Sequence, residues 1–387
     1  MKKIRIAVFG IRDAIWEVIK DEIDPQKAEI VLFLENDETK QGICYMNIPV
    51  TAPSEKVFGR YAVDAYLITA LSAYGDIKKQ LMELGVPAEQ IHLFIAKDIC
   101  KFCLGPVDDV DVNFLKKIYF EPEEIIGIID RYKEMYEQYS QITVCGETEG
   151  WFQHESLISH ACGGCVNGRR LAYSNSKEAF QYCIEKKFRL MECDVLRMDS
   201  GELVLGHDYR CFYDADMESY SVMTAEDLLH GMKENKTVSC LIDVKWKDHE
   251  EYRLILEELE RLVNFVSDSD GEKEELKKRI IMEVYDEATI KLACGRNFQM
   301  IFTQYRNSDW RYFMNTAVMC SQYGIRAVAL GAASCLEMKK FLNILTDKNI
   351  KIFVFSTDSI EEYSRLRKMG VSGVFTNYLF ESNISAY

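Results

Sequence analysis

Three carboxylates with the spacing of a metal site lie between residues 192 and 243 of this 387-residue chain. Glu192 and Asp194 alternate along a predicted strand at 189–196, so both side chains leave the same face and can share one divalent cation. A third acid, Asp243, belongs to a later predicted strand. Because carboxylate oxygens select hard ions, the three acids predict a Mg²⁺ or Ca²⁺ site.

Two histidines and one lysine accompany these acids. His160 and His207 each close a predicted strand, where an imidazole can take up or release a proton during catalysis. Lys245 follows Asp243 by two residues on the same strand face, where a fixed positive charge can hold a substrate phosphate. The alternative is that Lys245 only pairs with Asp243. Together with the acids, these residues predict metal-assisted acid–base chemistry on a phosphodiester.

Further short motifs lie around these residues in a fixed order. In chain order they are Ser159–Gly164, Tyr173–Phe180, Glu192-Cys-Asp194, Asp199-Ser-Gly201, His207-Asp208, Asp243-Val-Lys245 and Met369–Tyr378. This ordered set resembles the glycerophosphodiester phosphodiesterase family and its broader superfamily, which includes phosphatidylinositol-specific phospholipase C and sphingomyelinase D. The resemblance covers residues 153–387.

The resemblance implies a (β/α)₈ barrel that acts on a small-molecule phosphodiester. The site residues that it implies are the cation ligands Glu192, Asp194 and Asp243, the base His160, the acid His207, and the phosphate-binding residues Lys245 and Asn175. Attack by a neighbouring hydroxyl of the substrate would give a cyclic phosphate instead of hydrolysis.

Two positions depart from the family's common pattern. Ala161 follows His160 where many members carry an arginine near the phosphate, and Asp243 stands where typical members carry glutamate, as in sphingomyelinase D enzymes. The exact substrate therefore stays open. A phospholipase D-like or C-like lipid enzyme is one alternative, and a noncatalytic phosphate-binding or regulatory protein is another. Glu283, at the end of a later predicted strand, is either an extra ligand of the cation or a residue without a role in the site.

The length favours two domains, and the strand pattern divides the chain into three parts. Residues 1–104 alternate strands and helices and predict a small Rossmann-like parallel domain, residues 105–150 a helical acidic connector, and residues 151–387 the barrel. Catalytic residues of such barrels gather at the carboxyl ends of the strands. The eight strands predicted for the barrel are 157–160, 189–196, 240–244, 280–285, 300–305, 327–331, 351–356 and 373–377.

The first turn of the N-terminal part, after Phe9, carries the single glycine Gly10. A dinucleotide fingerprint needs three glycines, which tighten the turn and let the backbone approach the pyrophosphate. A structural or partner-docking module is therefore the favoured interpretation, with no cofactor assigned.

Composition limits the remaining function classes. A net charge of −15 disfavours nonspecific binding to nucleic acid or to an anionic membrane. The N-terminus is unlike a signal peptide and no apolar run approaches membrane-spanning length, so we expect a cytoplasmic protein without a transmembrane segment. Thirteen cysteines, an odd number, fit a reducing compartment. Two Cys-x-x-Cys pairs, Cys100/Cys103 and Cys162/Cys165, leave a shared zinc site as a minor alternative.

Overall fold

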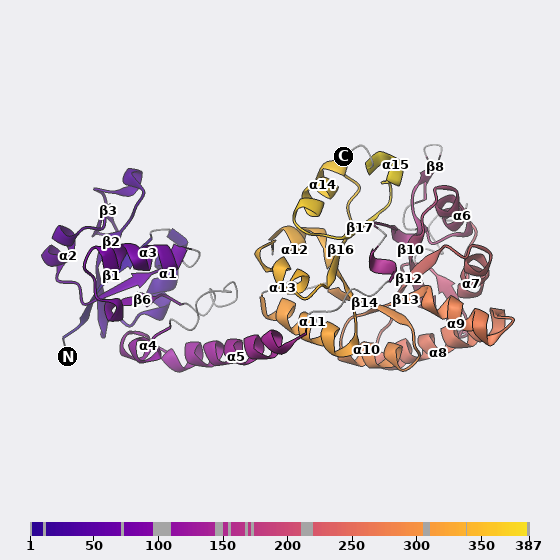
Figure 1. Ribbon diagram of the computed structural model, residues 1–387, viewed down its shortest axis with the longest axis horizontal. Helices are drawn as coiled ribbons and strands as arrows, with labels where there is room; N and C mark the ends of the chain where they lie inside the picture. Colours follow the sequence, from indigo (N-terminus) through magenta and orange to yellow (C-terminus); the bar gives the residue numbers. More distant parts are fainter. Residues whose placement is uncertain are drawn as a thin grey trace. The chain divides into compact units, whose positions relative to one another are not determined.

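The computed structural model describes residues 2–10, 13–70, 73–95, 110–143, 150–153, 156–166, 169–171, 174–209, 220–304, 310–337 and 339–384. The chain divides into two compact units, with the main boundary between Ser140 and Gln141. Figure 1 draws both units with their helices and strands labelled. No described helix is long and apolar enough to cross a membrane.

The first unit is built around a sheet in the order β3-β4-β2-β1-β5-β6. All neighbours are parallel except β3, which runs antiparallel to β4. The predicted Rossmann-like parallel sheet is therefore confirmed, with an antiparallel edge pair that the pattern did not indicate. Its strands are β1 (Ile4–Phe9), β2 (Ala28–Leu34), β3 (Cys44–Tyr45), β4 (Ile48–Thr51), β5 (Ala65–Ile68) and β6 (Ile91–Leu93), and its helices are α1 (Asp13–Glu22), α2 (Glu55–Tyr61) and α3 (Tyr74–Glu83).

Two helices, α4 (Val112–Ile118) and α5 (Pro122–Gln141), lie in the stretch predicted as a connector. The ring of Phe114 in α4 stacks on His92 of β6, with ring centroids 3.6 Å apart. Tyr119, which follows α4, donates its hydroxyl hydrogen to the Ile95 carbonyl at 3.0 Å. α4 therefore packs against the first sheet. The division at 104 and 150 stays a prediction.

The second unit contains a closed barrel of eight parallel strands. Closure comes from β10, which pairs with β7 through Met191 and Ser159. The short β11 (Leu203–Leu205) lies outside the barrel, antiparallel to β10. The eight predicted strands are confirmed to within two residues. They are β7 (Leu157–Ser159), β10 (Leu190–Arg197), β12 (Ser239–Val244), β13 (Ile280–Val284), β14 (Gln299–Gln304), β15 (Ala327–Gly331), β16 (Lys351–Phe355) and β17 (Gly373–Thr376).

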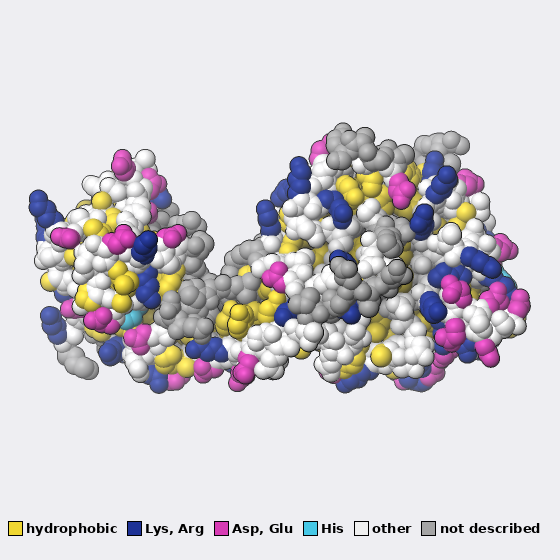
Figure 2. Space-filling model, in the orientation of Figure 1, with side chains coloured by type: hydrophobic (Ala, Val, Ile, Leu, Met, Phe, Trp, Pro, Cys, Tyr) yellow, Lys and Arg dark blue, Asp and Glu magenta, His cyan; other side chains and the backbone are white. Residues whose placement is uncertain are grey.

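Helices surround the barrel and cover its outer face (Figure 1). On the face shown in Figure 2, acidic and basic side chains mix over α8 and α9, where Arg253 and Arg261 pair with glutamates three or four residues away. Such surface pairs contribute only tenths of a kcal/mol each and indicate a solvated face. The barrel helices are α6 (Lys177–Glu185), α7 (Ala225–Glu234), α8 (His249–Val266), α9 (Asp270–Lys278), α10 (Glu287–Cys294), α11 (Trp310–Tyr323), α12 (Ala332–Glu337), α13 (Leu342–Thr346), α14 (Ile360–Lys368) and α15 (Glu381–Ile384).

The interior of the barrel is filled by apolar side chains, one or two from each strand. Because successive side chains of a strand alternate between its faces, residues two positions further along each strand also point inward. On β10, β12 and β13 these are charged residues, so the apolar layer forms the floor of a polar site. The layer consists of Ile158, Leu190, Leu241, Ile281, Ile301, Ala327, Ala329, Phe353 and Phe375.

Candidate active site

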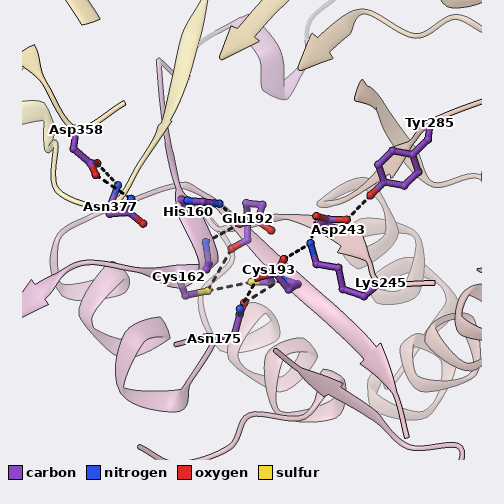
Figure 3. A network of polar contacts seen from close by, with 12 residues as sticks. His160, Cys162, Asn175, Glu192, Cys193, Asp243, Lys245, Tyr285, Asp358 and Asn377 are labelled. Carbon is purple, nitrogen blue, oxygen red and sulfur yellow. Dashed lines mark hydrogen bonds and ion pairs between the residues drawn. The ribbon is translucent and has the colours of Figure 1, made fainter. Parts of the chain in front are cut away.

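Three carboxylates converge above this apolar floor, and Figure 3 labels two of them, Glu192 and Asp243. Glu192 and Asp194 follow Leu190 at alternate positions of β10, and Asp243 on β12 is the register partner of Asp194. One carboxylate oxygen from each residue lies within 4.8 Å of the other two. All three side chains are buried, with Asp243 the most exposed at 7%. The structure thus brings together the three acids that the sequence nominated.

The cluster holds more negative than positive charge. Burial, and then repulsion from Asp194 and Asp243, raises the pKa of Glu192 well above its usual range. Burial also raises the pKa of Asp243, although Lys245 opposes the shift. Oxygen ligands that repel one another at this distance fit a hard divalent cation, which would relieve the repulsion.

Lys245 places a positively charged side chain beside this cluster. It follows β12 in the short loop before Asp248, whose side chain caps the start of α8. Its Nζ lies 2.7 Å from an oxygen of Asp194 and also pairs with Asp243. Burial alone would lower the pKa of Lys245, but the two carboxylates outweigh it and raise that pKa. The ammonium group is therefore charged and held over the acids.

A fourth carboxylate, Glu283, lies next to the three. β13 pairs with β12 so that Glu283 stands level with Asp243, and its side chain is buried. Burial, and then Asp243, raises the pKa of Glu283 well above its usual range. Glu283 is therefore a further acid whose ionised form the cluster disfavours.

His160 stands at the edge of the cluster, in the single 3₁₀ turn η7 (His160–Cys162) that follows β7. Its Nε2 lies 3.9 Å from Oε2 of Glu192, which also accepts a hydrogen bond of 2.7 Å from the backbone N–H of Ala161. Burial lowers the pKa of His160, although Asp194 opposes the shift. The imidazole is therefore neutral at neutral pH and able to accept a proton.

Asn175 lies against Asp194. Its Nδ2 donates to Asp194 Oδ2 at 2.7 Å, and its Oδ1 accepts from the backbone N–H of Asp194 at 3.0 Å. The backbone of Asn175 has a φ of 48°, a left-handed conformation that asparagine tolerates better than most residues. The two ends of the amide thus bind the carboxylate and the backbone of Asp194, and the expected contact with phosphate stays a prediction.

The backbone brings the segment that contains His207 alongside β10. The N–H of Gly206 donates to the Asp194 carbonyl at 3.0 Å, which brings the chain after β11 back to the level of Asp194. The His207 side chain is 56% exposed, and its Nδ1 lies 3.6 Å from Asp208 Oδ2. Its side chain is therefore far more open to solvent than that of His160.

Two residues at the site carried no signal in the sequence. The hydroxyl of Tyr285, just after β13, donates to Asp243. Asp358, after β16, accepts hydrogen bonds from Asn377 Nδ2 at 3.0 Å and from Thr376 Oγ1 at 2.8 Å, so it ties together two strand ends (Figure 3). Neither belongs to a spaced motif, and their partners are distant in sequence. Only a comparison of related sequences could have indicated them.

The Cys-x-x-Cys pairs are only partly visible. Cys100 and Cys103 lie outside the described residues, as does the side chain of Cys165. The thiol of Cys162 contacts Cys193, with the two Sγ atoms 3.0 Å apart. A shared zinc site therefore stays untested.

Comparison with known proteins gives two kinds of similarity. Residues 2–92 match the model of a family described as C2185-like, N-terminal. No curated protein matches the chain.

Several solved structures resemble part of the chain. A glycerophosphodiester phosphodiesterase from Parabacteroides distasonis is 15% identical, covers 57% of this chain and 92% of its own, and has a TM-score of 0.45. An Oleispira antarctica phosphodiesterase in complex with the product sn-glycerol-3-phosphate is 10% identical, covers 60% and 96%, and has a TM-score of 0.46. A glycerophosphodiester phosphodiesterase from Thermotoga maritima is 16% identical, covers 60% and 99%, and has a TM-score of 0.43. At such low identity we draw the function from the chain's own residues.

Proposed function

We propose that the barrel is a metal-dependent phosphodiesterase that cleaves a glycerophosphodiester or a related small phosphodiester by general acid–base catalysis. The convergence of Glu192, Asp194 and Asp243 beneath Lys245 carries this proposal. A buried cluster with this excess of negative charge is costly in a protein that binds no cation. Its place at the carboxyl ends of the strands is where barrel enzymes react.

Glu192, Asp194 and Asp243 are the residues that would hold Mg²⁺ or Ca²⁺, because each offers an oxygen to the same small volume. When bound, the cation supplies positive charge to a nonbridging phosphate oxygen. Asn175 supports this arrangement, since its amide fixes the orientation of Asp194 from both ends. We also retain phosphate binding as a second, less direct role for Asn175.

The remaining residues bind the phosphate and move protons. Lys245 presents a permanent positive charge to the phosphate and supports the negative charge that grows during bond cleavage. His160, neutral and beside Glu192, accepts a proton from the attacking hydroxyl or water at Nε2. His207 donates a proton to the leaving alkoxide. Its exposure suits a group that meets the substrate from the solvent side.

Two observations favour a second candidate, a noncatalytic phosphate-binding protein. His207 is half-exposed and pairs with Asp208, and Ala161 offers no polar side chain to a phosphate. In that case the acids and Lys245 would bind a cation and a phosphate without turnover.

Turnover assays with histidine variants distinguish the two candidates. Wild type should cleave glycerophosphodiesters, lysophospholipids or nitrophenyl phosphodiesters, and His160→Ala and His207→Ala should each lower kcat on the order of 10²–10⁴-fold. Because nitrophenolate leaves without protonation, a nitrophenyl diester should restore His207→Ala much more than His160→Ala. His230→Ala, an exposed histidine of α7, is the matched control and should keep wild-type activity.

Equal restoration of the two variants would contradict the assignment of base and acid. If wild type cleaves no phosphodiester yet binds a cation and phosphate, the noncatalytic candidate replaces the enzyme.

A further inference from the structure

A group of thiols lies directly behind the acidic cluster. On β10, Cys193 stands between Glu192 and Asp194, so it points to the opposite, outward face of the strand. Each of the four thiols is fully buried, and they come from four separate segments of the chain. They are Cys162 in η7, Cys183 in α6, Cys193 in β10 and Cys240 in β12.

Cys193 contacts two of the other thiols, Cys162 and Cys240. The Sγ atoms of Cys162 and Cys193 lie 3.0 Å apart (Figure 3). Cys183 is engaged elsewhere, since its Sγ lies 2.9 Å from Ser159 Oγ and 3.6 Å from the Gly163 carbonyl. Cys193 thus lies beside Cys162 although the two are 31 residues apart in the sequence.

We propose that Cys162 and Cys193 form a reversible disulfide that switches off the neighbouring site. The effect on catalysis rests on the proposed function, whereas formation of the bond does not. An S–S bond measures about 2.05 Å, so the two sulfur atoms need to approach by about 1 Å. A shift of η7 against β10 supplies such a movement.

The covalent step needs a peroxide as oxidant. One thiol attacks the peroxide oxygen and becomes a sulfenic acid, releasing one water from hydrogen peroxide. The second thiol attacks this sulfur, the S–S bond forms, and the sulfenic oxygen leaves as a second water. The two thiols together lose two electrons and two protons, and one peroxide becomes two waters. A dithiol reductant reverses the change by thiol–disulfide exchange.

Opening of η7 gives the oxidant access to these buried thiols. Ala161 and Cys162 both have a φ of 49°, a strained conformation for residues other than glycine. Cys162 and Cys193 are both fully buried while the turn is closed. The closed state therefore reacts slowly, and the rate of oxidation follows the opening of the turn.

The disulfide would act on the site through the groups beside each sulfur. Cys162 ends the turn that starts at His160, and Ala161 between them donates its N–H to Glu192. Drawing Cys162 towards Cys193 displaces His160 and disturbs this hydrogen bond. Because a misplacement of about 1 Å can cost on the order of 10²-fold in rate, we expect a loss of that size in turnover.

The experiment treats the intact chain with increasing hydrogen peroxide and follows two quantities. Peptide mass analysis should find a peptide pair joining Cys162 to Cys193 with the loss of two hydrogen atoms, and diester turnover should fall in proportion. A dithiol reductant should restore both. Cys193→Ala should keep its turnover under the same treatment, whereas Cys320→Ala, which removes a buried thiol of α11, should behave as wild type. Cys162→Ala replaces Cys193→Ala if the latter does not fold.

Loss of turnover without the Cys162–Cys193 peptide would overturn the proposal. So would an equal loss in Cys193→Ala, or a linked peptide with unchanged turnover. If wild type cleaves no diester, the enzyme proposal fails by itself. In that case the switch is tested by the linked peptide and by Tm: Mg²⁺ or Ca²⁺ should raise Tm less after oxidation than before, and an unchanged rise would contradict the switch.

Discussion

The acidic cluster should make the barrel's stability depend on a divalent cation, and Glu192→Gln should remove that dependence. The charge of Glu192 is strongly disfavoured, because this residue is buried and faces both Asp194 and Asp243. At a separation of 4.8 Å, each pair of ionised carboxylates repels by about 3.5 kcal/mol at an effective dielectric constant of about 20. Burial and this repulsion raise the pKa of Glu192, and a bound cation would relieve the repulsion.

The size of the expected shift in Tm follows from the linkage between cation binding and folding. A cation at about 100 times its Kd stabilises the native state by about 2.7 kcal/mol. For a unit of this size about 1 kcal/mol shifts Tm by about 2–4 °C, so Mg²⁺ or Ca²⁺ should raise Tm by about 5–10 °C over chelator. In chelator, Glu192→Gln should have a Tm equal to or slightly above that of wild type, since glutamine places a neutral side chain among the acids. At the same cation concentration it should gain at most a small fraction of the wild-type shift.

The assay is thermal unfolding followed by circular dichroism, in chelator and across a cation titration. Glu274→Gln, which alters an exposed acid of α9, is the matched control and should keep the full shift. An equal cation shift in Glu192→Gln and wild type would refute the reasoning, as would a wild-type Tm that no divalent cation changes.

Three further predictions concern pH, packing and domain division. Burial lowers the pKa of His92 from 6.5 to about 4, so the unfolded chain takes up this proton first as the pH falls. The free energy of unfolding of the first unit should therefore drop by about 3 kcal/mol as the pH falls from 6.5 to about 4. Chemical unfolding of His92→Gln should show a flatter dependence of this free energy on pH. A Cβ at Gly373 would lie 2.8 Å from the carbonyl oxygen of Ser156, so Gly373→Ala should cost about 1–3 kcal/mol in urea unfolding, whereas Gly271→Ala in α9 should be nearly neutral. The fragment 141–387 should fold and keep any diesterase activity; a folded fragment without the activity of the whole chain would show that the first unit contributes to the site.

Local pattern was enough to predict most of the architecture. The strands of the barrel are short apolar runs between helical segments, and this alternation can be recognised from local sequence without knowledge of distant residues. The same holds for Glu192 and Asp194, because alternation along a strand places positions two apart on one face whatever the strand pairs with. The sequence could therefore nominate the acids and the barrel together.

Contacts between distant segments depended on the tertiary structure. Closure between β10 and β7 brings His160 to Glu192, and the register of β10 with β12 sets Asp243 beside Asp194. The hydrogen bond of Asn175 to Asp194 and the contact of Cys162 with Cys193 were likewise not indicated by the sequence, because each joins segments far apart in the chain. The physical reason is that a local pattern specifies which face a side chain occupies, while its neighbour across that face is decided by strand register, barrel closure and packing.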